Sequence, residues 1–335
     1  MKSEENKRIF YLDIIRIVAC IMVITQHAPM PGLGTNSMLL SATSFLTYPC
    51  IGLFFMVSGA LLLPVKQTSS DFYRRRLTKV AIPTIVWTLL YLLLDLLKGD
   101  YPFIYILKSI VSIPLMPGVP AFWFIYVLIG LYLFAPIISP WLEKTTKSEI
   151  KLFLVLWGIS LLIPVLNGYT NIPYGYYSVL CYFGGYLGYF VLGYYMHNYP
   201  PKISLFSTLL LIGMPILAYA VCKHFNLRSD FNTYYYLSIF SAPMTTGWFL
   251  LLKKLFENVD LKRGNSIIKS FSNACFGIYL VHLLIMRNVL WEIDALSSYG
   301  GLLQIVLTSL LTLFLSYFIV YLLSKLPFSK YLIGY

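Results

Sequence analysis

Charged residues are scarce in this chain, and acidic residues are the scarcest of them. Of 335 residues, 11% are charged, with 13 Asp and Glu against 25 Lys and Arg, whereas a soluble domain carries about 25% charged residues. This scarcity excludes an ordinary soluble fold. Linkers rich in Ser, Gly and Pro, low-complexity tracts and an obvious internal repeat are also missing. The missing repeat weighs against a secondary transporter, because many transporters are built from paired halves.

Cysteine and histidine are also few, with five and four residues respectively. The cysteines are odd in number and scattered, without CxxC or Cys/His ligand spacing, so we interpret them as packing residues and expect no metal site. The first residues, MKSEENKR, precede a long apolar run, but no small-residue cleavage site follows that run. We therefore expect a first membrane span and not a signal peptide.

Apolar residues, in contrast, make up 59% of the chain, and the mean hydropathy is +0.75. Runs near the ~20 residues that cross a bilayer recur along the whole sequence. They predict an all-α polytopic membrane protein, with about ten transmembrane helices in one bundle that forms a single domain over residues 1–335. The expected spans are about 9–29, 44–64, 79–98, 121–141, 151–167, 178–197, 203–222, 234–253, 271–291 and 300–324.

The basic residues cluster in every second connection between these spans. If the first residues are cytoplasmic, the cytoplasmic tails and connections hold most of the 25 Lys and Arg, including Arg74, Arg75, Arg76 and Lys79. This positive-inside bias predicts that both termini and the loop at 65–78 are cytoplasmic. The net charge of +12 then reflects topology, with anionic membrane lipids and not nucleic acid as the partner.

Two ionisable side chains, Arg16 and His27, lie inside the first apolar run. A charge near the bilayer centre costs about 2.5–3.5 kcal/mol, so chains that keep one usually use it. Eleven helical residues turn through three turns plus ~20° and rise ~16 Å, so both side chains share a face. This predicts an anionic ligand that enters beside Arg16, with Asp13 as the partner of its guanidinium, and reacts near His27. The alternative is that Arg16 snorkels to headgroups and His27 is a satisfied polar residue.

Other spans also carry polar residues at depth. Ser58 lies in the second span, and Tyr279 and His282 lie one turn apart on one face of the ninth. Arg76 and Lys79 begin the third span one turn apart, where such a pair can bind phosphates as well as headgroups. A basic loop is also what the positive-inside rule requires, so both interpretations stay open there.

Short motifs occur in a consistent order along these spans: Arg-ten residues-His, a Phe-rich segment with Ser-Gly, a basic R-x-x-K before Pro, Trp-Phe, Leu-Tyr with a later Pro, and Tyr-Leu-x-His. The residues are Arg16, His27, Phe54, Phe55, Ser58, Gly59, Arg76, Lys79, Pro83, Trp123, Phe124, Leu131, Tyr132, Pro136, Tyr279 and His282. In this order they resemble the acyltransferase 3 family of bacterial membrane O-acyltransferases, with lysine in place of the family's second arginine. The chain is similar to the stand-alone members, including those that modify enterobacterial common antigen.

The resemblance implies transfer of an acyl group, usually acetyl, from cytoplasmic acyl-CoA to a hydroxyl of an envelope glycan or lipid-linked saccharide. It implies a multi-pass protein of the bacterial cytoplasmic (inner) membrane that uses acetyl-CoA as a substrate and no resident cofactor. The implied roles are catalysis by His27, acyl-CoA binding by Arg16, Arg75, Arg76 and Lys79, and site shaping or substrate binding by Asp13, Ser58, Trp123, Tyr279 and His282.

Several alternatives stay open at this point. These residues do not fix the acceptor or the oligomeric state. They also leave open whether the acyl group is acetyl or succinyl, and whether transfer is direct or passes through an acyl-enzyme on Ser58. A different class of protein is an exporter or flippase of a glycan-lipid intermediate, with Arg16 and His27 lining its path. A membrane anchor or sensor without chemistry is the third class.

Overall fold

The computed structural model describes residues 8–30, 37–164, 166, 178–225, 236–259 and 265–334. Within these residues the regular elements are all helical, which confirms the expected all-α class. Seven helical segments are long and apolar enough to cross a membrane, so the chain is a polytopic membrane protein. The count of ten spans stays a prediction.

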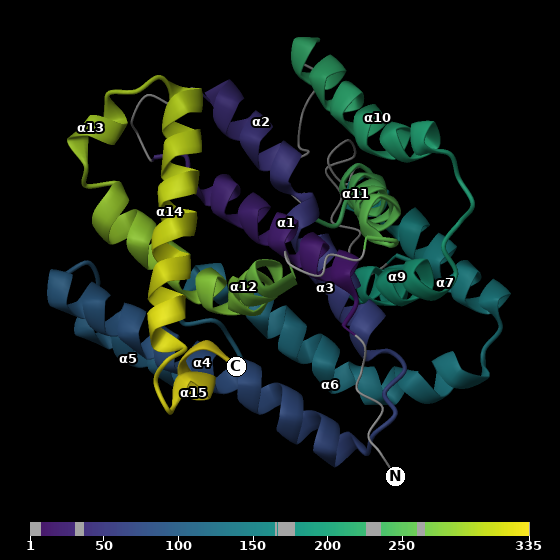
Figure 1. The fold of residues 1–335 in the computed structure, drawn as a ribbon, viewed down its shortest axis with the longest axis horizontal. Coiled ribbons are helices and arrows are strands. Elements are labelled where there is room, and N and C mark those ends of the chain that lie inside the picture. The colour runs from purple at the N-terminus through teal and green to yellow at the C-terminus, as the bar shows by residue number, and fades with distance from the viewer. Residues whose placement is uncertain are drawn as a thin grey trace.

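The described helices form one bundle, with α1, α3 and α12 near its centre and α5 and α10 toward the outside (Figure 1). Their bounds are α1 (Phe10–His27), α2 (Ser37–Thr47), α3 (Pro49–Leu62), α4 (Ser69–Lys98), α5 (Phe103–Ser112), η1 (Pro120–Phe122), α6 (Trp123–Lys144), α7 (Lys147–Ser160), η2 (Cys181–Phe183), α9 (Leu187–Asn198), α10 (Leu205–His224), α11 (Ser241–Phe256), α12 (Asn265–Ile285), η4 (Met286–Leu290), α13 (Asp294–Ser297), α14 (Gly301–Leu323) and α15 (Ser329–Ile333).

The third predicted span begins earlier than expected. Thr68 caps α4, because its side chain accepts a hydrogen bond of 3.2 Å from the backbone N–H of Asp71. The helix therefore starts at Ser69 and includes the three consecutive arginines, which the sequence prediction placed in a loop at 65–78. Pro83 lies inside this helix. The prediction of a loop over 69–78 was therefore wrong, whereas the cytoplasmic side of this segment stays a prediction.

Other boundaries also differ from the predicted spans. The helix in predicted span 44–64 is interrupted at Tyr48, because Pro49 begins a new helix, α3, although Met38–Leu62 still forms one candidate membrane span. Within 99–120, where no span was predicted, the chain forms α5, a helix of 10 residues.

Three predicted spans, 151–167, 178–197 and 234–253, contain the shorter helices α7, α9 and α11, of 14, 12 and 16 residues. Within 178–197, Gly185 has a φ of 88°, which glycine adopts without strain, and α9 begins only after it. Residues 165, 167, 234 and 235 of these predicted spans lie outside the described residues.

Helices α3 and α9 cross closely at two glycines. A Cβ atom on Gly59 would lie 1.8 Å from the carbonyl oxygen of Phe190, and one on Gly193 would lie 1.9 Å from that of Met56. Only glycine allows this backbone approach, which is a common device in membrane helix pairs. The crossing fixes the face of α3 that carries Ser58, next to Gly59.

The two ends of the described chain contact neighbouring turns in the middle of α12. The guanidinium of Arg8 donates a hydrogen bond of 3.1 Å to the side-chain oxygen of Asn273. At the other end of the chain, Gly334 lies against Phe276, on the next turn of α12. Figure 1 shows α15 folded back beside α4. The candidate site is built beside these turns of α12.

Candidate active site

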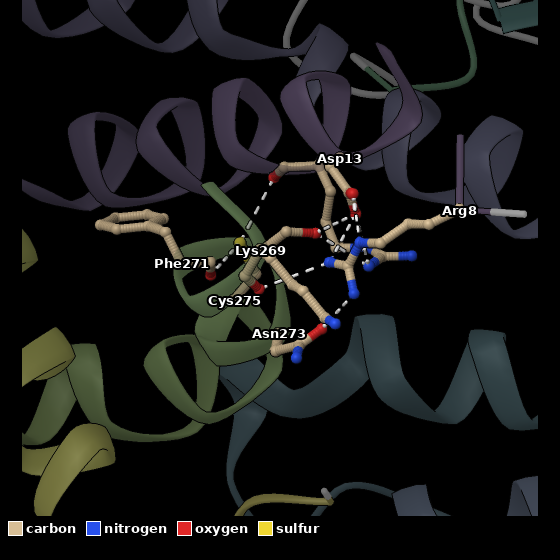
Figure 2. Close-up of polar contacts among 8 residues, drawn as sticks. Arg8, Asp13, Lys269, Phe271, Asn273 and Cys275 are labelled. Atoms are coloured by element: carbon tan, nitrogen blue, oxygen red, sulfur yellow. Dashed lines mark hydrogen bonds and ion pairs between the residues drawn. The ribbon is translucent and has the colours of Figure 1, made fainter. Parts of the chain in front are cut away.

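A buried carboxylate organises the basic residues at the start of α1. Asp13 is 5% exposed and receives hydrogen bonds of 2.5 and 2.9 Å from the guanidinium of Arg8. The hydroxyl of Ser272 on α12 donates to Asp13 at 2.6 Å. Arg16 lies 3.7 Å from the same carboxylate and donates to Ser272 at 3.0 Å. Figure 2 shows Arg8 between Asp13 and Asn273.

The expected pairing of Asp13 with Arg16 is therefore present but longer than the pairing with Arg8. The sequence prediction missed both Arg8 and Ser272. Arg8 lies just before the first apolar run, where a basic residue is ordinary. Ser272 lies 256 residues from Arg16 along the chain, and its role depends on α12 lying beside α1.

A cavity of about 300 Å³ lies between α1, α3, α4, α6 and α12. The residues that line it include Arg16, Ser58, Arg76, Lys79, Tyr132, Ser272, Phe54, Phe124 and Tyr279. Along α12 it extends from Ser272, which contacts Arg16, to Tyr279, a rise of about 10 Å. The cations thus line one end, and aromatic rings line the other.

Two further cavities adjoin the basic end. One, of about 540 Å³, is lined by Lys66, Gln67, Arg75, Arg76 and Lys79 among others. The other, of about 440 Å³, includes Arg8, Asp13, Arg16, Ser58 and Arg76. Arg76 lines all three cavities. Arg76 is therefore the residue that the three cavities share.

The cations of this region differ in whether their side chains already have hydrogen-bond or ion-pair partners. Within the described part of the chain, Arg76 and Lys79 make no hydrogen bond or ion pair. Arg75 donates to the amide oxygen of Gln67 at 3.2 Å. Arg76 and Lys79 therefore provide positive charge that an anionic ligand can neutralise.

The partly buried histidine of α1, His27, lies beside the buried histidine of α12, His282. The ring centroids of His27 and His282 are 5.4 Å apart. Nδ1 of His282 lies 2.6 Å from the carbonyl oxygen of Tyr279. Because a carbonyl only accepts, Nδ1 carries the proton and Nε2 keeps its lone pair. That Nε2 is buried without a hydrogen-bond partner among the described residues.

Tyr279 forms the boundary between the cavity and the histidine pair. Its side chain lines the cavity, and its ring centroid lies 5.5 Å from that of His282. Its hydroxyl donates to the carbonyl oxygen of Ala121 at 2.5 Å. Neither His27 nor His282 is among the described residues that line the three cavities.

Trp123 lies outside these cavities. Its ring packs on Tyr186 and Tyr236, with centroid distances of 5.6 and 5.2 Å. The hydroxyl of Tyr236 accepts a hydrogen bond of 2.7 Å from Gln26, the neighbour of His27 on α1. The structure thus places Trp123 with an aromatic group near the far end of α1 and not with the cations.

Fold and site together define a polytopic membrane protein with a cavity between its helices that is basic at one end and aromatic at the other. The model of the acyltransferase 3 family, described as an acyltransferase domain, matches residues 9–321. The chain therefore belongs to this family and is a membrane acyltransferase. No curated protein and no solved structure matches it.

Proposed function

We propose that this protein is an acyl-CoA-dependent O-acyltransferase that moves a short acyl group, acetyl above all, to a hydroxyl of an envelope glycan or lipid-linked saccharide. The observation that carries the proposal is the convergence of Arg16, Arg76 and Lys79 on one cavity that ends at Tyr279. Family membership supports acyl transfer, and it gives no support to the exporter alternative.

The donor fits the shape and charge of the three cavities. Coenzyme A joins a nucleotide with phosphates to a thin pantetheine arm that ends in the thioester. Arg76 stands at the junction, so its planar guanidinium can bind phosphate oxygens in pairs, while Lys79 adds a point charge. The cavity with Arg75 and Lys66 then takes the nucleotide. The narrow cavity of about 300 Å³ takes the arm and brings the thioester to Tyr279.

His27 is the general base of the proposed reaction. The acceptor oxygen attacks the thioester carbonyl, a C–O bond forms and the C–S bond breaks. The proton passes from the acceptor hydroxyl to the neutral imidazole of His27 and then to the departing thiolate of CoA. His282, whose Nδ1 is fixed on Tyr279, supports the ring of His27. In this mechanism the side chain of Tyr279 turns aside for the thioester to reach His27.

The acceptor and the membrane orientation belong to the same proposal. A sugar ring can stack on the aromatic group of Trp123, Tyr186 and Tyr236, which the hydrogen bond from Gln26 to Tyr236 joins to the turn of α1 that carries His27. The basic cavities face the cytoplasm of a bacterial inner membrane, where acyl-CoA is present. The shared position of both chain ends near these cavities supports cytoplasmic termini.

Radiolabelled acetyl-CoA tests this function. Purified protein is incubated with a bacterial envelope glycolipid extract and acetyl-CoA that carries ¹⁴C in its acetyl group. The CoA thiol that is released and the label in the glycolipid fraction are then measured. We expect equal amounts of both, and loss of both in His27→Ala. Label trapped on the protein and lost in Ser58→Ala would establish an acyl-enzyme in place of direct transfer. A folded protein that neither binds nor consumes acetyl-CoA would overturn the proposal.

A further inference from the structure

A short helix outside the family match completes the narrow cavity. The match ends at residue 321, whereas Ile333 and Gly334 line the cavity that contains Arg16 and Lys79. The helix is α15, which follows α14 and folds back onto α4 and α12. Residues 329–334 are called the closing segment below.

The closing segment is held by specific contacts. The indole N–H of Trp87 on α4 donates a hydrogen bond of 2.8 Å to the carbonyl oxygen of Leu332. The side chain of Ile333 is completely buried. A Cβ atom on Gly277 of α12 would lie 3.2 Å from Cγ2 of Ile333, so the two helices meet there without spare room. The segment is thus packed as part of the cavity wall.

Gly334 touches the turn of α4 that carries Lys79. Its φ of 80° is in the left-handed region. A Cβ atom at this position would lie 2.6 Å from the carbonyl oxygen of Lys79 and 3.0 Å from the ring of Phe276. Glycine is therefore required at this position for two reasons, the left-handed backbone conformation and the close approach to α4 and α12.

We propose that the closing segment retains the acyl donor by closing the side of the cavity that takes the pantetheine arm. This inference rests on the proposed function. Ile333 packs against Gly277 of α12 behind the cavity wall, and Gly334, which also lines the cavity, holds the Lys79 turn against Phe276. The segment contributes no charged group to the lining of this cavity. It should therefore act on the arm more than on the nucleotide phosphates.

Two probes distinguish an effect on binding of the arm from an effect on binding of the nucleotide. They are acetyl-CoA and adenosine 3′,5′-bisphosphate, which lacks the arm. Titration calorimetry of the full-length protein in detergent measures both affinities. Gly334→Ala should raise the Kd of acetyl-CoA about tenfold and that of the bisphosphate by clearly less, because displacement of the Lys79 turn reaches only one of the phosphate-binding cations. Gly99→Ala is the matched control, because Gly99 also has a positive φ, of 75°, but has nothing within 4 Å of an added Cβ. It should change neither affinity.

Trp87→Phe provides a second variant without a steric conflict, since it removes the hydrogen bond to Leu332 and leaves a smaller aromatic ring in the same place. It should raise the Kd of acetyl-CoA about threefold without an effect on the bisphosphate, because Trp87 contacts Leu332 and not the Lys79 turn. If both variants bind acetyl-CoA as wild type does, or lose both probes equally, the inference is wrong while the proposed function stands. If the wild-type protein binds neither probe, the proposed function itself fails.

Discussion

Replacing Asp13 by Asn removes the negative charge around which Arg8, Arg16 and Ser272 are arranged. Asn has nearly the same shape and keeps one acceptor oxygen, so it leaves no void. It cannot satisfy the two hydrogen bonds of 2.5 and 2.9 Å from Arg8 together with that of 2.6 Å from Ser272. The amide N–H₂ would also face a guanidinium, which has no acceptor.

The expected magnitude follows from the exposure of this group. Breaking a fully buried ion pair costs about 3–5 kcal/mol. The side chain of Asp13 is 7% exposed but that of Arg8 is 34% exposed, so water recovers part of the loss. We expect Asp13→Asn to lower the free energy of unfolding by about 1.5–3 kcal/mol, the range for hydrogen bonds to a charged group.

Glu143→Gln is the matched control, because Glu143 pairs with Lys66 at 2.8 Å while both side chains are exposed, at 43% and 75%. That change should cost less than about 1 kcal/mol. Denaturant unfolding in detergent measures stability, and calorimetry measures acetyl-CoA affinity. We expect weaker donor binding in Asp13→Asn, because Arg16 loses its anionic partner. Equal stability and equal donor affinity in the two variants would refute the reasoning.

Three further predictions concern packing, donor binding and catalysis. Gly59→Ala should lower the free energy of unfolding by at least about 3 kcal/mol, because the new Cβ meets a backbone oxygen at 1.8 Å; thermal unfolding measures this. Arg16→Ala and Arg76→Ala should each weaken acetyl-CoA binding by about 1.5–3 kcal/mol, measured by calorimetry. His27→Ala should slow acetyl transfer by about 10²–10⁴-fold at saturating acetyl-CoA, with a smaller loss for His282→Ala.

Each of these has a result that would contradict it. Gly130→Ala on α6 is the control for Gly59, since an added Cβ there has nothing within 4 Å; a similar loss in both would remove the close-crossing argument. Unchanged affinity in both folded arginine variants would remove the donor assignment. Near-normal turnover in His27→Ala, with turnover abolished in His282→Ala, would assign the base to the other histidine.

The level of a side chain along the bundle could be predicted from the sequence, but its neighbours could not. Arg16, Arg76 and Lys79 each lie near one end of an apolar run, and the structure places them around one cavity. Ser272 and Gly334 line the same cavity, although neither stands out in the sequence. Their positions depend on α12 and α15 packing beside α1 and α4, which hydropathy alone does not encode.

For the helices, likewise, the sequence predicted where the long ones lie but not where each one begins. Apolar runs identified the long helices, because crossing a bilayer sets their length. Local geometry at Thr68, Pro49 and Gly185 decided where helices begin, and such caps and turns are compatible with many sequences. The separation of His27 from the cavity by Tyr279 is a matter of side-chain packing that motif spacing did not indicate.

A cryo-electron-microscopy structure of the protein with acetyl-CoA tests the central claim most directly. The account predicts the pantetheine arm in the cavity between α1, α4 and α12, with phosphates on Arg76 and Lys79 and the thioester at Tyr279. Donor density outside this cavity, or phosphates without contact to either cation, would contradict it.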